Sequence, residues 1–110
     1  MFFKPDIEKI KKDGQIDRLI PLLKHRRASV REEALTAIFE ISCYDPEIVE
    51  QFRYMLGDRN VDVKIRTTLL FARIGDPGVI DNLHEIITNG SLNEQVEVLR
   101  ILPHYYSKDN

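Results

Sequence analysis

Apolar residues recur at helical spacing between residues 30 and 41, and charged residues occupy the opposite side of the same stretch. Two looser copies of this pattern follow, the first 33 residues further along the chain and the second another 31 residues on. Four positions align in each copy: Val30, Ala34, Ile38 and Ile41; Val63, Thr67, Phe71 and Ile74; Glu94, Val98, Leu102 and Tyr105. A helix repeated at a fixed period stacks on its copies, because it cannot bury its apolar stripe alone.

A shorter apolar helix is expected before each of these three helices. Asp45-Pro46 and Asp76-Pro77 start two of them, because aspartate is a good N-cap and proline suits the first helical position. Ser29, Asp62 and Asn93 are the expected N-caps of the second helix in each pair. The pairs then cover residues 15–44, 45–75 and 76–106, after a leading helix near residues 6–12, and no strand is expected.

These residues resemble the short HEAT-like repeat, the type named after phycobilisome lyases. The matching positions are Leu22-Leu23, Val30-Arg31, Ala34, Ala37, Ile38 and Ile41 in the first copy, and Leu56, Asp58, Val63, Phe71 and Ile74-Gly75-Asp76-Pro77 in the second. The resemblance implies an all-α, right-handed α-α superhelix, a solenoid of three helix pairs plus the leading helix, as one domain over residues 1–110. It implies no particular activity, because such repeats serve unrelated functions.

Composition favours a cytoplasmic protein. Hydrophobic residues make up 43% and charged residues 31% of the 110 positions, which is typical of a helical globular domain. The opening MFFKPD does not resemble a signal peptide, and no apolar run approaches the roughly 20 residues that span a bilayer. The single cysteine, Cys43, rules out an intrachain disulfide.

Charge is distributed unevenly along the chain. Residues 1–31 hold nine Lys/Arg against four Asp/Glu, a net of +5, and residues 32–110 hold seven against fourteen, a net of −7. A basic patch is therefore expected at Lys24, Arg26, Arg27 and Arg31, and binding of nucleic acid through it is the alternative function. The sequence pI of about 5.9 makes this alternative the less favoured one.

No catalytic, cofactor or metal site is expected. His84-Glu85 invites comparison with the His-Glu pairs that deoxyhypusine hydroxylases carry on HEAT-like repeats, but it lies on a first helix and has no second pair. Cys43, His25 and His104 belong to the ends of different repeats, so nothing orients them as a nucleophile and base. The chain is therefore expected not to be an enzyme.

The favoured function is a protein-protein interaction module, a small adaptor or scaffold that binds a partner on the concave face of the second helices. The expected contact residues are the polar and unexplained apolar positions opposite the core: Glu32, Thr36, Phe39, Ile65, Leu69, Arg73, Val96 and Arg100. The alternative left open is that some of these side chains pack against a neighbouring repeat.

Two further expectations concern the contacts between repeats. Glu33, Arg66 and Glu97 share one aligned column, and Glu40 and Arg73 share another, so ion pairs between adjacent repeats are expected. The last repeat ends without an obvious polar cap, which favours homo-oligomerisation through it, unless the segment around Pro103 and the two following tyrosines folds back as a cap.

Overall fold

The computed structural model describes residues 5–107, with side-chain positions through residue 103. It is about 80% helical, with seven α-helices and no strand in the described part of the chain, so the all-α prediction is confirmed. The helical segments are α1 (Ile7–Lys12), α2 (Ile16–Leu19), η1 (Ile20–Lys24), α3 (Ala28–Ile41), α4 (Pro46–Val49), η2 (Glu50–Gly57), α5 (Val61–Arg73), η3 (Pro77–Val79), α6 (Ile80–Asn89) and α7 (Leu92–Ser107), where η denotes 3₁₀ helix.

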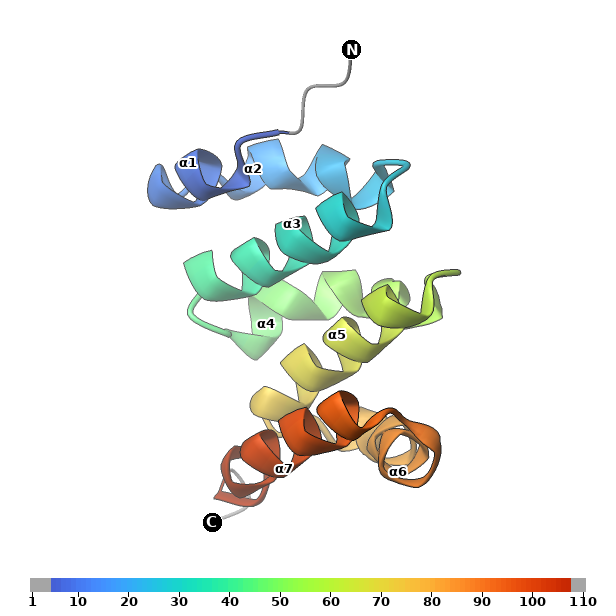
Figure 1. The fold of residues 1–110 in the computed structure, drawn as a ribbon. Helices are drawn as coiled ribbons and strands as arrows, with labels where there is room; N and C mark the ends of the chain where they lie inside the picture. Colours follow the sequence, from blue (N-terminus) through green and yellow to red (C-terminus); the bar gives the residue numbers. More distant parts are fainter. Residues whose placement is uncertain (1–4, 108–110) are drawn as a thin grey trace.

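The helices α1, α3, α5 and α7 form one row, in which each packs against the next. The shorter segments pack on this row: α2 and η1 on α3, η2 on α5, and α6 on both α5 and α7. Figure 1 shows α3, α5 and α7 following one another down the molecule, with α1 and α7 towards opposite ends. The extents of 41 × 29 × 21 Å reflect this row of helices.

Each shorter segment combines α-helical and 3₁₀ geometry. Pro21 lies at the start of η1, where α2 continues into a tighter turn. Asp45 and Asp76 cap the next two segments as predicted, because their carboxylates accept hydrogen bonds from the backbone N–H groups of Glu47 and Gly78 at 3.0 and 2.7 Å.

The second helix of each pair, α3, α5 or α7, begins earlier than predicted. Ser29, Asp62 and Asn93 each lie inside the first turn, so the prediction that they are N-caps is wrong. The capping side chains stand two residues earlier: Asn60 accepts from the N–H groups of Asp62 and Val63, and Ser91 accepts from that of Glu94. Glu94 in turn accepts from the Ser91 N–H, which completes a capping box.

One hydrophobic cluster runs from α1 to α7. Most of the aligned apolar column is fully buried: Val30, Ala34, Ile38, Val63, Thr67, Phe71 and Val98. Thr67 is tolerated there because its hydroxyl donates to the carbonyl oxygen of Val63 at 2.7 Å. The rings of Phe39 and Phe71 meet edge to face at 5.2 Å and join α3 to α5. Within the described residues, no helix is long and apolar enough to span a membrane.

Candidate protein-binding surface

Charged side chains link all four helices of the row on one side of the molecule. Lys11 of α1 lies 3.6 Å from the Glu40 carboxylate of α3, measured from Nζ to Oε2. Arg66 of α5 reaches Glu32 on α3 through its Nε at 3.3 Å and Glu97 on α7 through an Nη at 3.5 Å. We call this surface the row face.

The ion pairs agree only in part with the sequence prediction. The pair between Arg66 and Glu97 is confirmed, but on α3 the partner is Glu32, one residue before the predicted Glu33. The predicted pair of Glu40 with Arg73 is wrong, because the Arg73 guanidinium lies 4.3 Å over the ring of Tyr44 and donates to its hydroxyl at 2.9 Å. The partner of Arg73 is therefore Tyr44, in the turn between α3 and α4, and not Glu40 as the alignment predicted.

Two clefts of opposite charge adjoin Arg66 on the row face. The first, of 350 Å³, lies between α1 and α3 and is lined by four glutamates and two cations: Glu8, Glu32, Glu33, Glu40, Lys11 and Arg66. The second, of 230 Å³, lies between α5 and α7 and is lined by three arginines over an apolar floor: Arg66, Arg73, Arg100, Leu69, Leu70 and Ile101. We call them the acidic cleft and the arginine cleft.

The charge of the row face does not follow the expected division of the chain into a basic segment up to residue 31 and an acidic remainder. The arginine cleft lies in the part expected to be acidic, whereas three of the four glutamates of the acidic cleft come from residues after position 31. The acidic cleft carries four negative charges against two positive ones and lies between α1 and α3, whereas no carboxylate of the described residues lines the arginine cleft. Within the acidic cleft, the Glu40 carboxylate raises the pKa of the Lys11 ammonium above its ordinary value. Charge summed along the chain thus does not describe the charge of this surface, because each helix turns only some of its residues towards it.

Two residues of the expected contact patch are buried. Leu69 is 2% exposed and Phe39 is fully buried, so the prediction that they are exposed contact residues is wrong, although Leu69 forms part of the floor of the arginine cleft. The cause is the next helix in the row: Phe39 packs on Phe71 of α5, and Leu69 lies at the α5–α7 contact beside Arg100. A position opposite the core of its own pair is therefore not necessarily exposed.

The other expected residues fall into two groups. Glu32 and Thr36 line the acidic cleft, and Arg73 and Arg100 line the arginine cleft, so the structure brings these four to the row face. Ile65 is half-buried against the core and lines a separate 320 Å³ cleft between α5 and α6. Val96 is 38% exposed on α7.

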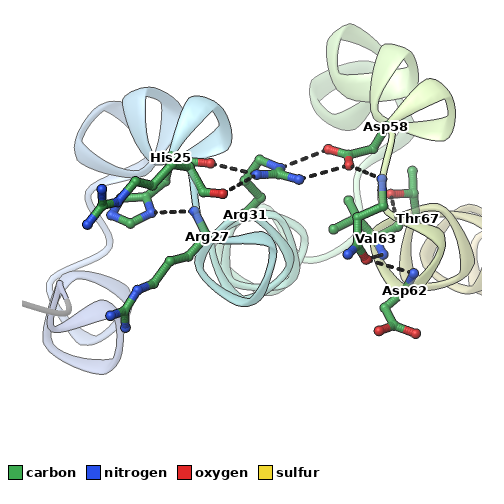
Figure 2. A network of polar contacts seen from close by, with 9 residues as sticks. His25, Arg27, Arg31, Asp58, Asp62, Val63 and Thr67 are labelled. Atoms are coloured by element: carbon green, nitrogen blue, oxygen red, sulfur yellow. Dashed lines mark hydrogen bonds and ion pairs between the residues drawn. The ribbon is translucent and has the colours of Figure 1, made fainter.

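Arg31, expected in the basic patch, is instead a buried clamp between the first two helix pairs (Figure 2). It is 5% exposed and binds both carboxylate oxygens of Asp58, through Nε at 2.9 Å and Nη2 at 3.0 Å. Its Nη1 donates to the carbonyl oxygens of His25 and Arg26 at 2.7 and 3.1 Å. All three nitrogen atoms of the Arg31 guanidinium thus donate hydrogen bonds within the chain, and Arg31 is not part of an exposed basic surface.

Asp58 completes this clamp from the loop before α5. Its Oδ1 also accepts a hydrogen bond from the Asn60 N–H at 2.8 Å, so the carboxylate holds the loop as well as Arg31. The hydrogen bonds from Arg31 lower the pKa of Asp58 below its ordinary value, against the opposing effect of burial. Both residues stood in the motif of the resemblance, but their pairing was missed because they lie 27 positions apart.

The corresponding residues at the next junction form no such clamp. Adding the repeat period carries Arg31 to Lys64 and Asp58 to Asn89, and both line the 320 Å³ cleft between α5 and α6. An ion pair between Arg53 and Asp76 bridges the second and third pairs elsewhere. Of the remaining patch, Lys24, Arg26 and Arg27 are exposed.

The residues that the sequence analysis considered for metal binding or catalysis are not brought together by the fold. His84 and Glu85 are exposed on α6, where Glu85 accepts a hydrogen bond from Asn89. Among the residues that the structure describes, no group of three or more His, Cys, Asp or Glu side chains could hold a metal ion. The side chain of His104 lies outside the described ones.

Comparisons with protein-family models, with curated proteins and with solved structures give no match for this chain. The functional argument therefore depends on the residues and geometry of the chain itself.

Proposed function

We propose that this chain is a non-enzymatic protein-interaction module of the HEAT-like type, which binds a partner on the row face. Support for a right-handed superhelix comes from the motif resemblance and from the sequential packing of α1, α3, α5 and α7. The proposed binding residues are those of the contact patch expected from the sequence that line the two clefts: Glu32, Thr36, Arg73 and Arg100.

The observation that carries the proposal is the pair of adjoining clefts with opposite charge. Arg66 lines both, so a bound segment that crosses it meets carboxylates on one side and guanidiniums on the other. A peptide with a basic side chain near one end and an acidic side chain near the other fits this order of charges. Arginine is suited to the second contact, because it can bind a carboxylate through two parallel hydrogen bonds.

Nucleic-acid binding has less support than protein binding. It depends on a basic N-terminal patch, and Arg31 has all its charged groups engaged by Asp58 and two carbonyl oxygens. The acidic cleft also belongs to the N-terminal helices, and its four carboxylates would repel a phosphate backbone.

Site-specific photo-crosslinking tests the row face directly. A benzophenone amino acid at position 36, in the acidic cleft, should give a covalent adduct with a protein from the source organism's lysate. The control places the same probe at Gln51, which is exposed on η2, one of the shorter segments packed on the row, and it should give no adduct. An adduct formed equally at both positions, or at Gln51 alone, contradicts the proposal.

A charge-reversal pair on α5 provides the second arm of this test. Arg73→Glu reverses one charge of the arginine cleft, whereas Lys64→Glu reverses an exposed charge on the other side of the same helix. We expect the first variant to lower the yield of the position-36 adduct and the second to leave it unchanged, with both retaining wild-type helicity. Equal yields from the two variants would rule out a role for the arginine cleft.

A further inference from the structure

The 320 Å³ cleft between α5 and α6 lies where the second helix pair meets the third, and we call it the junction cleft. It is separate from the row face, because no residue lines both the junction cleft and either of the two row-face clefts. Ile65, which the sequence placed in the contact patch, lines the junction cleft instead. The first junction of the chain holds the Arg31 clamp at the corresponding place, so the two junctions can be compared residue by residue.

Three differences between the junctions account for the junction cleft. The repeat period pairs each residue of the first junction with one that lines the cleft: Arg31 with Lys64, Leu35 with Thr68, and Asp58 with Asn89. Arg31 is 5% exposed and Leu35 is fully buried, so both side chains fill the first junction. In the second junction the lysine is exposed, the threonine is shorter than leucine, and the asparagine has no charge to hold a cation. The cleft is therefore the space that the arginine and leucine occupy one repeat earlier.

Carboxylates remain at the second junction, but they stand on the helices. Glu85, one turn before Asn89 on α6, accepts a hydrogen bond from the asparagine Nδ2 at 3.1 Å. Glu94 on α7 accepts one from the Ser91 N–H at 2.8 Å. Both bonds use Oε1, and the second oxygen of each carboxylate accepts no hydrogen bond from the described residues. Lys64 is the one cation among the described residues that line the cleft, so two carboxylates face one ammonium, a net of −1.

The walls and the charge of the cleft favour one kind of ligand. Val61, Ile65 and Ile86 give it apolar walls, on which the methylene groups of an alkyl chain can pack. The negative net charge favours a cation over an anion. A guanidinium suits the site better than an ammonium, because its planar group carries five N–H donors for several acceptors and is more weakly hydrated. At the first junction the fold already holds such a group, since the Arg31 guanidinium is buried there with four hydrogen bonds.

We propose that the junction cleft binds an alkyl guanidinium from another molecule, in the place that Arg31 fills at the first junction. The guanidinium donates to the carboxylates of Glu85 and Glu94, and the alkyl chain packs on Ile65 and Ile86. The group is either an arginine side chain of a protein or a free alkyl guanidine, and the probes below distinguish the two sources. This proposal is independent of the partner proposed for the row face, because the sites share no lining residue.

Nuclear magnetic resonance titration of the isotope-labelled chain tests the site residue by residue. N-acetyl-L-arginine amide represents an arginine within a protein, and agmatine represents a free alkyl guanidine. At least one of them should shift the backbone amide signals of Ile65, Asn89 and Gly90 in a saturable way, and the tighter of the two identifies the source. We expect a dissociation constant in the millimolar range, as for a single small group. N-acetyl-L-citrulline amide has the same shape but a neutral ureido group, and it should bind roughly tenfold more weakly than the arginine amide.

Two substitutions in the cleft should change the affinity in opposite directions. Glu85→Lys reverses the net charge of the cleft and should raise the dissociation constant roughly fivefold or more. Lys64→Gln removes the ammonium that repels the ligand and should lower the constant by roughly twofold. Glu47→Lys is the matched control, because Glu47 is exposed on α4 and does not line the cleft, and it should leave the constant unchanged. Glu85 and Lys64 are both exposed, so the variants should fold, which circular dichroism checks.

Four results would each overturn the proposal. The first is the absence of a saturable shift with both guanidinium probes at concentrations on the order of 100 mM. The second is citrulline binding as tight as arginine binding, which would mean that the charge has no role. The third is a set of shifts confined to residues of the acidic cleft. The fourth is equal affinity of the Glu85→Lys and Glu47→Lys variants for the probes.

Discussion

Replacing Arg31 by methionine removes the clamp between the first two helix pairs while keeping an unbranched apolar stem of similar reach. The substitution removes two hydrogen bonds to the Asp58 carboxylate and two to the carbonyl oxygens of His25 and Arg26. The Asp58 carboxylate would remain, with its side chain only 9% exposed, and would have lost its counter-charge. The variant therefore leaves a buried charge without its partner, which costs more than the loss of a surface ion pair.

The expected loss is about 3 kcal/mol of unfolding free energy, the low end of the range for breaking one side of a buried ion pair. That is a large share of the roughly 5–15 kcal/mol that stabilises a domain of ordinary size. At about 4–8 °C for each kcal/mol, the melting temperature should fall by roughly 12–24 °C.

Urea denaturation followed by circular dichroism measures this change, with Lys64→Met as the matched control. Lys64 occupies the aligned position in the next pair and is exposed, so its substitution should change the free energy by no more than about 0.5 kcal/mol. Adding Asp58→Leu to Arg31→Met removes the stranded charge and should recover part of the loss, with a coupling of roughly 0.5–3 kcal/mol. If Arg31→Met costs less than about 1 kcal/mol, the pair behaves as an exposed salt bridge and the clamp argument fails.

Three other changes test the same structure. Because Arg31 lowers the pKa of Asp58, the ionised carboxylate stabilises the folded state at pH values above its ordinary pKa near 4. The difference in unfolding free energy between wild type and Asp58→Asn should therefore shrink as the pH falls below about 4. Lys64→Arg combined with Asn89→Asp should install a second clamp and raise the unfolding free energy by up to about 1 kcal/mol in urea titrations; no gain would mean that the two junctions differ in backbone geometry. Gly90→Ala should lower the melting temperature because its Cβ would clash with the backbone carbonyl oxygen of Ile86, one turn earlier. Gly57→Ala, with open space around its Cβ, should leave the melting temperature unchanged.

The interior side of each helix followed from the sequence. Helical periodicity identified Val30, Ala34 and Ile38 as core residues, and the 33-residue offset found Val63 and Phe71, because an apolar stripe on a helix must be buried against something. The aspartate-proline starts of the second and third pairs were also predictable, since capping depends on residues next to one another in the chain.

Only the packing of one pair on the next decided which remaining residues are exposed. Leu35 and Leu99 occupy the same aligned position of their repeats, yet Leu35 is fully buried, whereas Leu99 is 64% exposed on α7, the last row helix of the described part of the chain. The local sequence predicted that Arg31 belongs to a basic surface, but the fold places Asp58, 27 residues further along the chain, beside its guanidinium. Periodicity reports the direction of a side chain around its own helix axis, whereas exposure and ion pairing depend on neighbours that the local pattern does not contain.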